Sequence, residues 1–193
     1  MTKHLEIILT NGLLKKNLKD LFINLNKREY VDPDPLIFLY DYNDLKNREI
    51  VGLISSSLAY GNVKQILKSV RKVLTLMGTS PYNYILQADK KSLTESFAGF
   101  KHRFTTGDEL VDFLLCIKNV ILEHGSLYNC FKSGFNQKDD TIIPALTNFY
   151  KSITSYSNKT KSSLLPNPEK GSAVKRLNLY LRWMISKDEV DPG

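Results

Sequence analysis

Residues 165–175 read LPNPEKGSAVK and lead into the last helix-like segment of the chain. Apolar residues follow at the three- and four-residue spacing of one helix face: Val174, Leu177, Leu181 and Met184. This spacing predicts a helix with Lys175 on its first turn. An aspartate, Asp191, comes after the predicted helix, where the chain can turn back.

The same periodicity runs through most of the sequence. Apolar stripes predict helices over residues 14–25, 50–58, 63–77, 110–121, 142–153 and 174–184, with a short helix over 126–132. No convincing alternating strand and no internal repeat is found. The sequence therefore predicts an all-α domain of about eight to ten helices joined by short connections.

Two segments without helical periodicity suggest how the chain is divided. Asp and Pro alternate over residues 32–35 and must break a helix there. We therefore expect residues 1–33 to form an N-terminal helical extension and residues 34–193 to form the main helical domain. Residues 155–168 are polar, and their composition predicts a mobile loop.

The composition limits the classes of protein to consider. Hydrophobic residues make up 42% of the chain and charged residues 24%, which is ordinary for a globular domain. No apolar run is long enough to cross a membrane, so no membrane partner is expected. Residues 1–16 lack the layout of a signal peptide, because polar residues interrupt them. We expect a cytoplasmic protein.

The few cysteines and histidines argue against a metal centre. Cys116 and Cys130 lie in apolar helical patterns, which predicts buried free thiols. An iron–sulfur cluster requires about four cysteines. The three histidines, His4, His102 and His124, are far apart in sequence, so no zinc site is expected. Neither a metal nor a small-molecule cofactor is predicted.

The net charge of +7 is unevenly distributed. Residues 50–88 contain no acid, and Glu169 is the only acid between residues 141 and 187. The basic residues of these two tracts are Lys64, Lys68, Arg71, Lys72, Lys151, Lys159, Lys161, Lys170, Lys175, Arg176, Arg182 and Lys187. Such tracts suit a polyanion, because neutralising phosphates releases counterions. An ordinary solvated surface is the alternative interpretation.

The small-residue turn, Lys175 and the Val190-Asp191 pair together resemble the active-site segment of the helix-hairpin-helix (HhH-GPD type) DNA glycosylases. There a Leu-Pro-Gly-x-Gly-x-Lys turn precedes a helix, and a Val-Asp pair follows it. The resemblance implies a glycosylase-like helical bundle with a helix-hairpin-helix over residues 164–186. It also implies that the Lys175 amine attacks the sugar to form a Schiff base, while Asp191 stabilises the cationic sugar and helps deprotonate the amine.

The resemblance further implies that the protein binds double-stranded DNA carrying a damaged base. Backbone amides of the turn would hold a phosphate at the N-terminus of the last helix. Basic side chains would hold the distorted strand while the base is flipped out. The residues assigned to this surface are Gly171, Ser172, Ala173, Lys170, Arg176, Arg182, Arg103 and Lys64.

Upstream segments carry weaker similarity. Residues 49–61 resemble the early core of the same superfamily, where an apolar helix ends in a turn before a second helix. Residues 100–104 resemble an aromatic-Arg turn of those enzymes. More closely, the chain is similar to an uncharacterised bacterial family of conserved hypothetical proteins, through residues 58–61 (LAYG), residues 181–184 (LRWM) and the Val-Asp pair.

The sequence departs from the glycosylase pattern at several positions. Residues 167–170 separate Leu-Pro from Gly171, Ala173 replaces the second glycine, and Ser57 stands where many relatives place a glutamine that fills the vacancy of the flipped base. The spacing from the lysine to the aspartate is a few residues short. A further helix would follow Asp191 in that superfamily, so a C-terminal truncation is a hypothesis.

Three functions stay open from the sequence. The first is a DNA N-glycosylase with AP lyase activity, the second a non-catalytic nucleic-acid-binding protein, and the third a helical interaction protein unrelated to DNA. In the last two, Lys175 is a solvent-facing helix lysine. Tyr180 and Trp183 could stack on bases, but aromatic residues at helical spacing favour the core.

Overall fold

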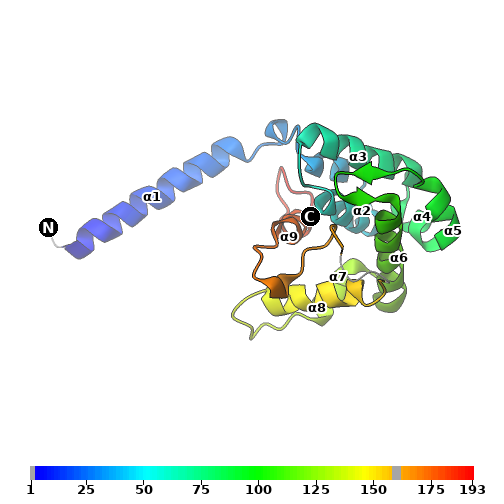
Figure 1. The fold of residues 1–193 in the computed structure, drawn as a ribbon. Helices are drawn as coiled ribbons and strands as arrows, with labels where there is room; N and C mark the ends of the chain where they lie inside the picture. The colour runs from blue at the N-terminus through cyan, green and yellow to red at the C-terminus, as the bar shows by residue number, and fades with distance from the viewer. Residues whose placement is uncertain (1–2, 158–161) are drawn as a thin grey trace.

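The computed structural model describes residues 3–157 and 162–193, and this part of the chain is mostly helical (Figure 1). The α-helices are α1 (Lys3–Leu25), α2 (Leu45–Ser57), α3 (Val63–Met77), α4 (Pro81–Gln87), α5 (Lys90–Ser96), α6 (Gly107–His124), α7 (Leu127–Ser133), α8 (Ile143–Thr154) and α9 (Lys175–Ile185). Three 3₁₀-helices, η1 (Arg28–Tyr30), η2 (Pro35–Asp41) and η3 (Pro168–Lys170), and two short strands, β1 (Lys101–His102) and β2 (Thr105–Thr106), complete the described elements. The predicted all-α class is confirmed.

Polar side chains fix where the main helices begin. Asp44 accepts a hydrogen bond from the backbone N–H of Asn47 and so caps α2, and Asn62 caps α3 in the same way through the N–H of Lys64. Such caps satisfy amides that have no partner within the helix. Helix α6 ends at Gly125, which adopts a left-handed conformation with φ 79°.

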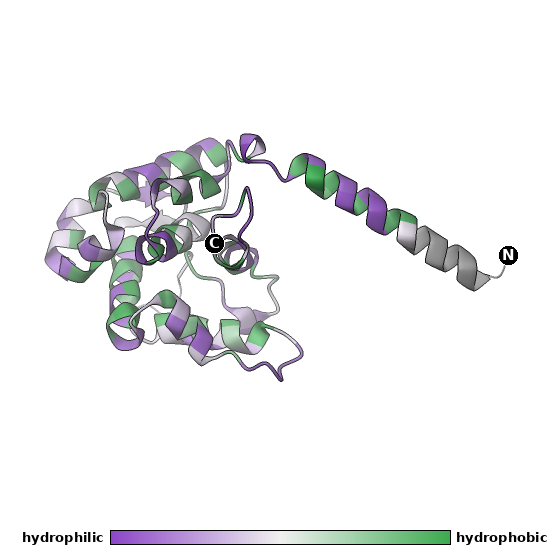
Figure 2. Ribbon diagram, turned by 180° about the vertical axis from the view of Figure 1, so that it is seen from behind, coloured by the Kyte–Doolittle hydropathy of each residue, from purple (hydrophilic) through white to green (hydrophobic). Residues whose placement is uncertain are grey.

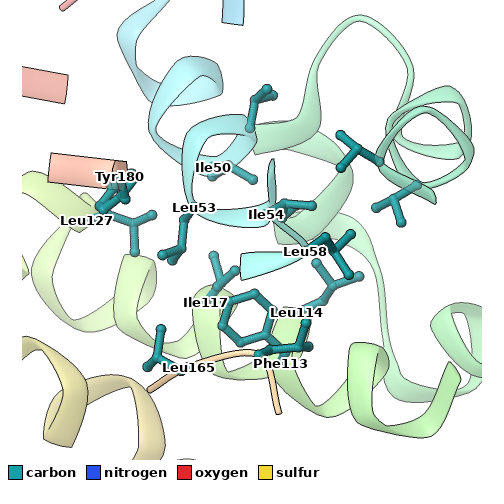
Figure 3. Close-up of a cluster of buried hydrophobic side chains, with 14 of the residues drawn as sticks. Ile50, Leu53, Ile54, Leu58, Phe113, Leu114, Ile117, Leu127, Leu165 and Tyr180 are labelled. Atoms are coloured by element: carbon teal, nitrogen blue, oxygen red, sulfur yellow. The ribbon is translucent and has the colours of Figure 1, made fainter. Parts of the chain in front are cut away.

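Helix α2 forms the centre of the hydrophobic core. Every residue of the range 49–58 is buried, which agrees with the near absence of charge in this segment. Figure 3 shows Ile54 and Leu58 facing Leu114 and Ile117 of α6. Each fully buried side chain of this kind stabilises the fold by about 1.5–3 kcal/mol.

Helix α9 packs antiparallel along α2. A Cβ atom added to Gly52 would lie 3.3 Å from side-chain atoms of Tyr180 and Met184, so the glycine allows close approach of the two helices. The ring of Tyr180 stacks on Phe149 of α8, with 6.1 Å between centroids. Tyr180 and Trp183 are both buried, as their helical spacing predicts.

Helix α1 projects away from the body of the molecule, as both views show (Figures 1 and 2). The predicted helix over residues 14–25 is present as part of α1, but its apolar side chains are exposed to solvent. Leu14, Leu18, Leu21, Phe22 and Leu25 are each between 54% and 62% exposed. The division of the chain at residue 33 stays a prediction.

Two short helices and a hairpin lie between α3 and α6, where the apolar spacing predicts no element. Pro81 occupies the first turn of α4, a position that tolerates proline. Asp89 and Ser92 form a capping box that begins α5. Strands β1 and β2 correct the expectation that no strand is present. Helices α4 and α5 have seven residues each, which leaves few turns in which periodicity can show, although α7, of the same length, lies close to the short helix predicted over 126–132.

Both cysteines are buried free thiols, as predicted. Burial raises the pKa of Cys116 to about 12 and also raises the pKa of Cys130. Thiols of this kind are unreactive, because the thiolate is the nucleophile. Among the described residues there is no cluster of three or more metal-binding side chains, and no helix is long and apolar enough to cross a membrane.

A buried carboxylate connects α2 to α7. The Oε2 atom of Glu49 accepts hydrogen bonds from the backbone N–H groups of Leu127, at 2.8 Å, and Tyr128, at 3.3 Å. The hydroxyl of Ser126 accepts the N–H of Asn129, so Glu49 and Ser126 together satisfy the first turn of α7. Burial raises the pKa of Glu49, while the two amide donors oppose this rise.

We expect Glu49→Ala to lower the free energy of unfolding by about 1–3 kcal/mol, because it leaves the buried amide of Leu127 and the partly buried amide of Tyr128 without an acceptor. Glu49→Gln keeps a carbonyl acceptor and should cost less. Urea denaturation followed by circular dichroism measures both. Exposed Glu95→Ala on α5 is the control and should change stability by no more than about 0.5 kcal/mol. Equal stability of the Glu49→Ala and Glu95→Ala variants would contradict the capping role.

Candidate functional site

The turn before α9 is built from two left-handed residues. Gly171 ends η3 with φ 64° and ψ 14°, and Val174 precedes α9 with φ 41° and ψ 38°. A left-handed conformation costs a β-branched residue about 1–2 kcal/mol, and the burial of Val174 offsets that cost. The helix begins at Lys175, so this prediction is confirmed.

The first helix of the predicted helix-hairpin-helix is reduced to one 3₁₀ turn. Residues 164–167 are not helical, and η3 covers only Pro168–Lys170. Pro166 and Pro168 explain this, since proline lacks an amide donor and restricts the residue before it. The helix-hairpin-helix over residues 164–186 is therefore not confirmed.

The N-terminus of α9 has no side-chain cap among the described residues. The turn residues Gly171, Ser172 and Ala173 are all exposed. The Ser172 hydroxyl accepts the N–H of Val174 at 3.3 Å, one residue before the helix begins. The partial positive charge of the helix end therefore faces an open turn of small residues.

Two lysines, Lys170 and Lys175, flank the turn at the N-terminus of α9. Both are exposed. Glu169, the one acid of this tract, is paired with Lys151, with 2.7 Å between Nζ and Oε1. Within residues 3–157 and 162–193, no ion pair involves Lys64, Arg103, Lys170 or Lys175. Two further predicted basic residues, Lys159 and Lys161, lie outside the described residues.

Arg176 is directed into the protein instead of toward the surface. Its guanidinium donates to the carbonyl of Ser57 at 2.5 Å and to the carbonyl of Ser163 at 2.7 Å. Its Cζ atom lies 4.9 Å from the centre of the Tyr60 ring. Burial lowers the pKa of Arg176, although an arginine stays charged in proteins. The positive group lies at the C-terminal end of α2, where the helix dipole favours it.

Arg176 therefore joins three segments that are distant in sequence. These donors are used inside the protein, so they do not point toward a bound DNA strand. Arg176 therefore has a structural role, and its predicted role as a DNA-binding residue is corrected. Ser57 is buried as well, so its side chain cannot replace a flipped base in the manner of the glutamine of the glycosylases.

The turn after α2 connects the hairpin that carries Arg103 to Arg176 at the start of α9. The hydroxyl of Tyr60, which lies under Arg176, donates to the carbonyl of His102 at 3.0 Å. The side chain of Arg103 lies against Gly61, where an added Cβ would come within 2.6 Å of Cδ. Lys64 is exposed on the first turn of α3. We call Lys64, Arg103, Lys170, Lys175 and the turn 171–173 the basic surface.

Asp191 lies at the other end of α9 and is 1% exposed. Its Oδ2 atom pairs with Nε of Arg182 at 3.0 Å, while its Oδ1 atom is buried and has no hydrogen-bond partner among the described residues. The side chain lines a hollow together with Ser186, Asp188 and, from α1, Phe22. The backbone N–H groups of Val190 and Asp191 donate hydrogen bonds to Oδ1 of Asp188. These bonds lower the pKa of Asp188 and hold residues 188–191 in a turn.

Lys175 and Arg182 are two turns apart on one face of α9, about 10 Å along its axis. The structure pairs Asp191 with Arg182, and no contact between Lys175 and Asp191 occurs among the described residues. The assignment of Lys175 and Asp191 as a catalytic pair stays a prediction, as does the binding of DNA by Arg182.

Sequence reasoning missed the residues that position the basic surface. The Tyr60 hydroxyl lies 2.6 Å from the Thr105 hydroxyl, which in turn lies 2.5 Å from the Ser163 hydroxyl. These polar residues have no periodicity, and their partners are more than 40 positions away in sequence. The turn 58–61 is the one signal in the sequence that points to them.

A family model described as Protein of unknown function (DUF2400) matches residues 34–193. No curated protein matches the chain. No solved structure matches it.

We expect Arg176→Met to lower the free energy of unfolding by about 1–3 kcal/mol, because the carbonyls of Ser57 and Ser163 lose a charged donor. Lys175→Met, at the neighbouring exposed position, is the matched control and should stay within about 0.5 kcal/mol of the original protein. Urea denaturation measures the difference. If both variants unfold at the same urea concentration, Arg176 does not hold the segments together.

Proposed function

We propose that this chain, which belongs to the family described as Protein of unknown function (DUF2400), binds double-stranded DNA through its basic surface. One observation carries the proposal: the N-terminus of α9 opens onto exposed small residues between two lysines that pair with no acid of the described chain. The uneven net charge of +7 supports a polyanionic partner.

The chemistry of a phosphate group fits this arrangement. Helix N-termini bind phosphates because free backbone N–H groups and the helix dipole both favour an anion. Gly171 and Ala173 keep bulky side chains away from those amides. Lys170 and Lys175 supply full charges beside them. Lys64 and Arg103, across the turn 58–61, extend the surface so that more than one phosphate of a strand can be neutralised.

We expect salt-sensitive binding of duplex DNA, measured by fluorescence anisotropy over a range of salt concentrations. The double variant Lys170→Gln/Lys175→Gln should weaken binding and reduce the magnitude of the salt slope by about 2, because each neutralised phosphate adds close to one to that slope. Lys91→Gln is the control, because α5 lies on the side of the body away from α9 (Figure 1). Absence of salt-sensitive binding by the original protein would favour a helical interaction protein unrelated to DNA.

A second candidate function, DNA N-glycosylase with AP lyase activity, is favoured by Asp191. Its buried carboxylate has one oxygen without a partner among the described residues, and such a group is suited to stabilise a cationic sugar. It lies along the face of α9 that begins with Lys175. In this reaction the Lys175 amine attacks C1′ of the nucleotide, and the base leaves with the electron pair of the glycosidic bond. One amine proton goes to the departing base and the other to the ring oxygen O4′, as the sugar ring opens and the imine forms.

Sodium borohydride reduces such an imine to a stable amine, so it tests the second candidate directly. Duplexes that carry 8-oxoguanine, uracil, an alkylated base or an abasic site are the probes. We expect a covalent protein–DNA adduct that Lys175→Gln abolishes and that Lys170→Gln, at the other exposed lysine of the turn, retains. No adduct on any duplex, with salt-sensitive binding intact, would overturn the lyase mechanism and leave a binding protein.

A further inference from the structure

Phe104 is the most exposed large hydrophobic side chain among the described residues, at 74%. Strands β1 and β2 pair antiparallel with His102 opposite Thr105, so Arg103 and Phe104 form the tip of a tight hairpin. A scattered exposed leucine needs no explanation, but an aromatic ring at a hairpin tip has a large apolar area and few ways to cover it.

The base of this hairpin is held rigidly. The ring of His102 forms hydrogen bonds with the Ser69 hydroxyl, at 2.9 Å, and with the carbonyl of Tyr60, at 3.2 Å. The hydroxyl of Thr105 lies within hydrogen-bond distance of Tyr60 and Ser163. The backbone that carries the Phe104 ring is therefore held in place by these hydrogen bonds. The hairpin loses little conformational freedom when the ring contacts a ligand.

At the tip of the hairpin, the Phe104 ring lies beside the positive charge of Arg103. Arg103 adopts φ 51°, a left-handed conformation that costs a residue other than glycine about 1–2 kcal/mol. In this conformation the side chain lies against Gly61, and its Cζ atom is 5.3 Å from the centre of the Phe104 ring. The hairpin thus presents a guanidinium for a phosphate next to a flat ring.

The hairpin belongs to the basic surface, because Tyr60 contacts both the hairpin and Arg176 of α9. An apolar ring among the cations of this surface matches a ligand that combines negative charge with flat apolar faces. Nucleic acid has this combination, but the base faces of a continuous duplex are covered by stacking. Only an unpaired base presents a free face to a protein ring.

We propose that Phe104 stacks on an unpaired base of the nucleic acid bound at the basic surface. The protein then binds a bulged or gapped duplex more tightly than a continuous one. This inference rests on the proposed DNA binding. Base–aromatic stacks of this kind, tested by alanine substitution, are worth about tenfold or more in affinity.

The test compares a continuous duplex with the same duplex carrying a one-base bulge of 2-aminopurine. Anisotropy reports affinity, and 2-aminopurine fluorescence reports stacking on the unpaired base. We expect a preference of about tenfold for the bulged duplex, with quenched fluorescence in the complex. Phe104→Ala should remove both effects and keep the affinity for continuous duplex, while Phe104→Trp should retain them.

Leu122→Ala is the matched control, because Leu122 is a 65% exposed apolar residue on α6 outside the basic surface. Equal affinity for the two duplexes, or a preference that survives in Phe104→Ala, would overturn the stacking role and leave the proposed DNA binding intact. Absence of salt-sensitive binding to either duplex would overturn both proposals.

Discussion

The antiparallel contact between α2 and α9 is the constraint on which the rest of the structure depends. Helix α2 is buried along almost its whole length, so its position is set by the core and not by solvent. Gly52 lets α9 approach at van der Waals distance, and this fixes the depth of α9. Arg176 donates to the carbonyl of Ser57 and so ties the first turn of α9 to the end of α2. Arg48 of α2 donates to the carbonyl of Pro192 and so holds the segment that follows α9.

The contact between α2 and α9 determines which side chains of α9 are buried and which face solvent. Its buried face carries Leu177, Tyr180 and Trp183, while Lys175 and Arg182 remain on the exposed face. The open helix end faces outward because the arginine after Lys175 uses its donors inside the body. The turn 58–61, and with it the hairpin of β1 and β2, is joined to the first turn of α9 through Tyr60 and the guanidinium of Arg176.

Long helices can be predicted from the sequence, but the roles of single side chains cannot. Helix α3 has the predicted bounds, because its apolar residues repeat over four turns between a capping asparagine and a glycine. Helices α4 and α5 and the hairpin depend on caps and tertiary contacts that periodicity does not report.

Lys175 and Arg176 are adjacent basic residues, and only the fold shows that Lys175 faces solvent while Arg176 donates hydrogen bonds inside the protein. The position of Asp191 after the helix is visible in the sequence, whereas its ion pair depends on how residues 186–193 fold back. Residues 100–104 are marked in the sequence by their resemblance to an aromatic-Arg turn, but the exposure of Phe104 is not, because an exposed aromatic residue looks like a core residue in a sequence.

The geometry of α9 also sets a condition on any chemistry at this surface. Lys175 and Arg182 lie on one face, two turns apart, and Asp191 is held at the Arg182 end. A strand bound along this face meets the helix N-terminus at one end and the buried carboxylate at the other. The rise of the helix sets this distance, and Arg176 ties the N-terminal end of α9 to the end of α2. The Lys175 side chain, about 6 Å long when extended, must therefore turn along the helix axis to act on a sugar that Asp191 stabilises. Binding of a phosphate at the open amides and chemistry at Asp191 are thus separable, and a protein that retains the first need not retain the second.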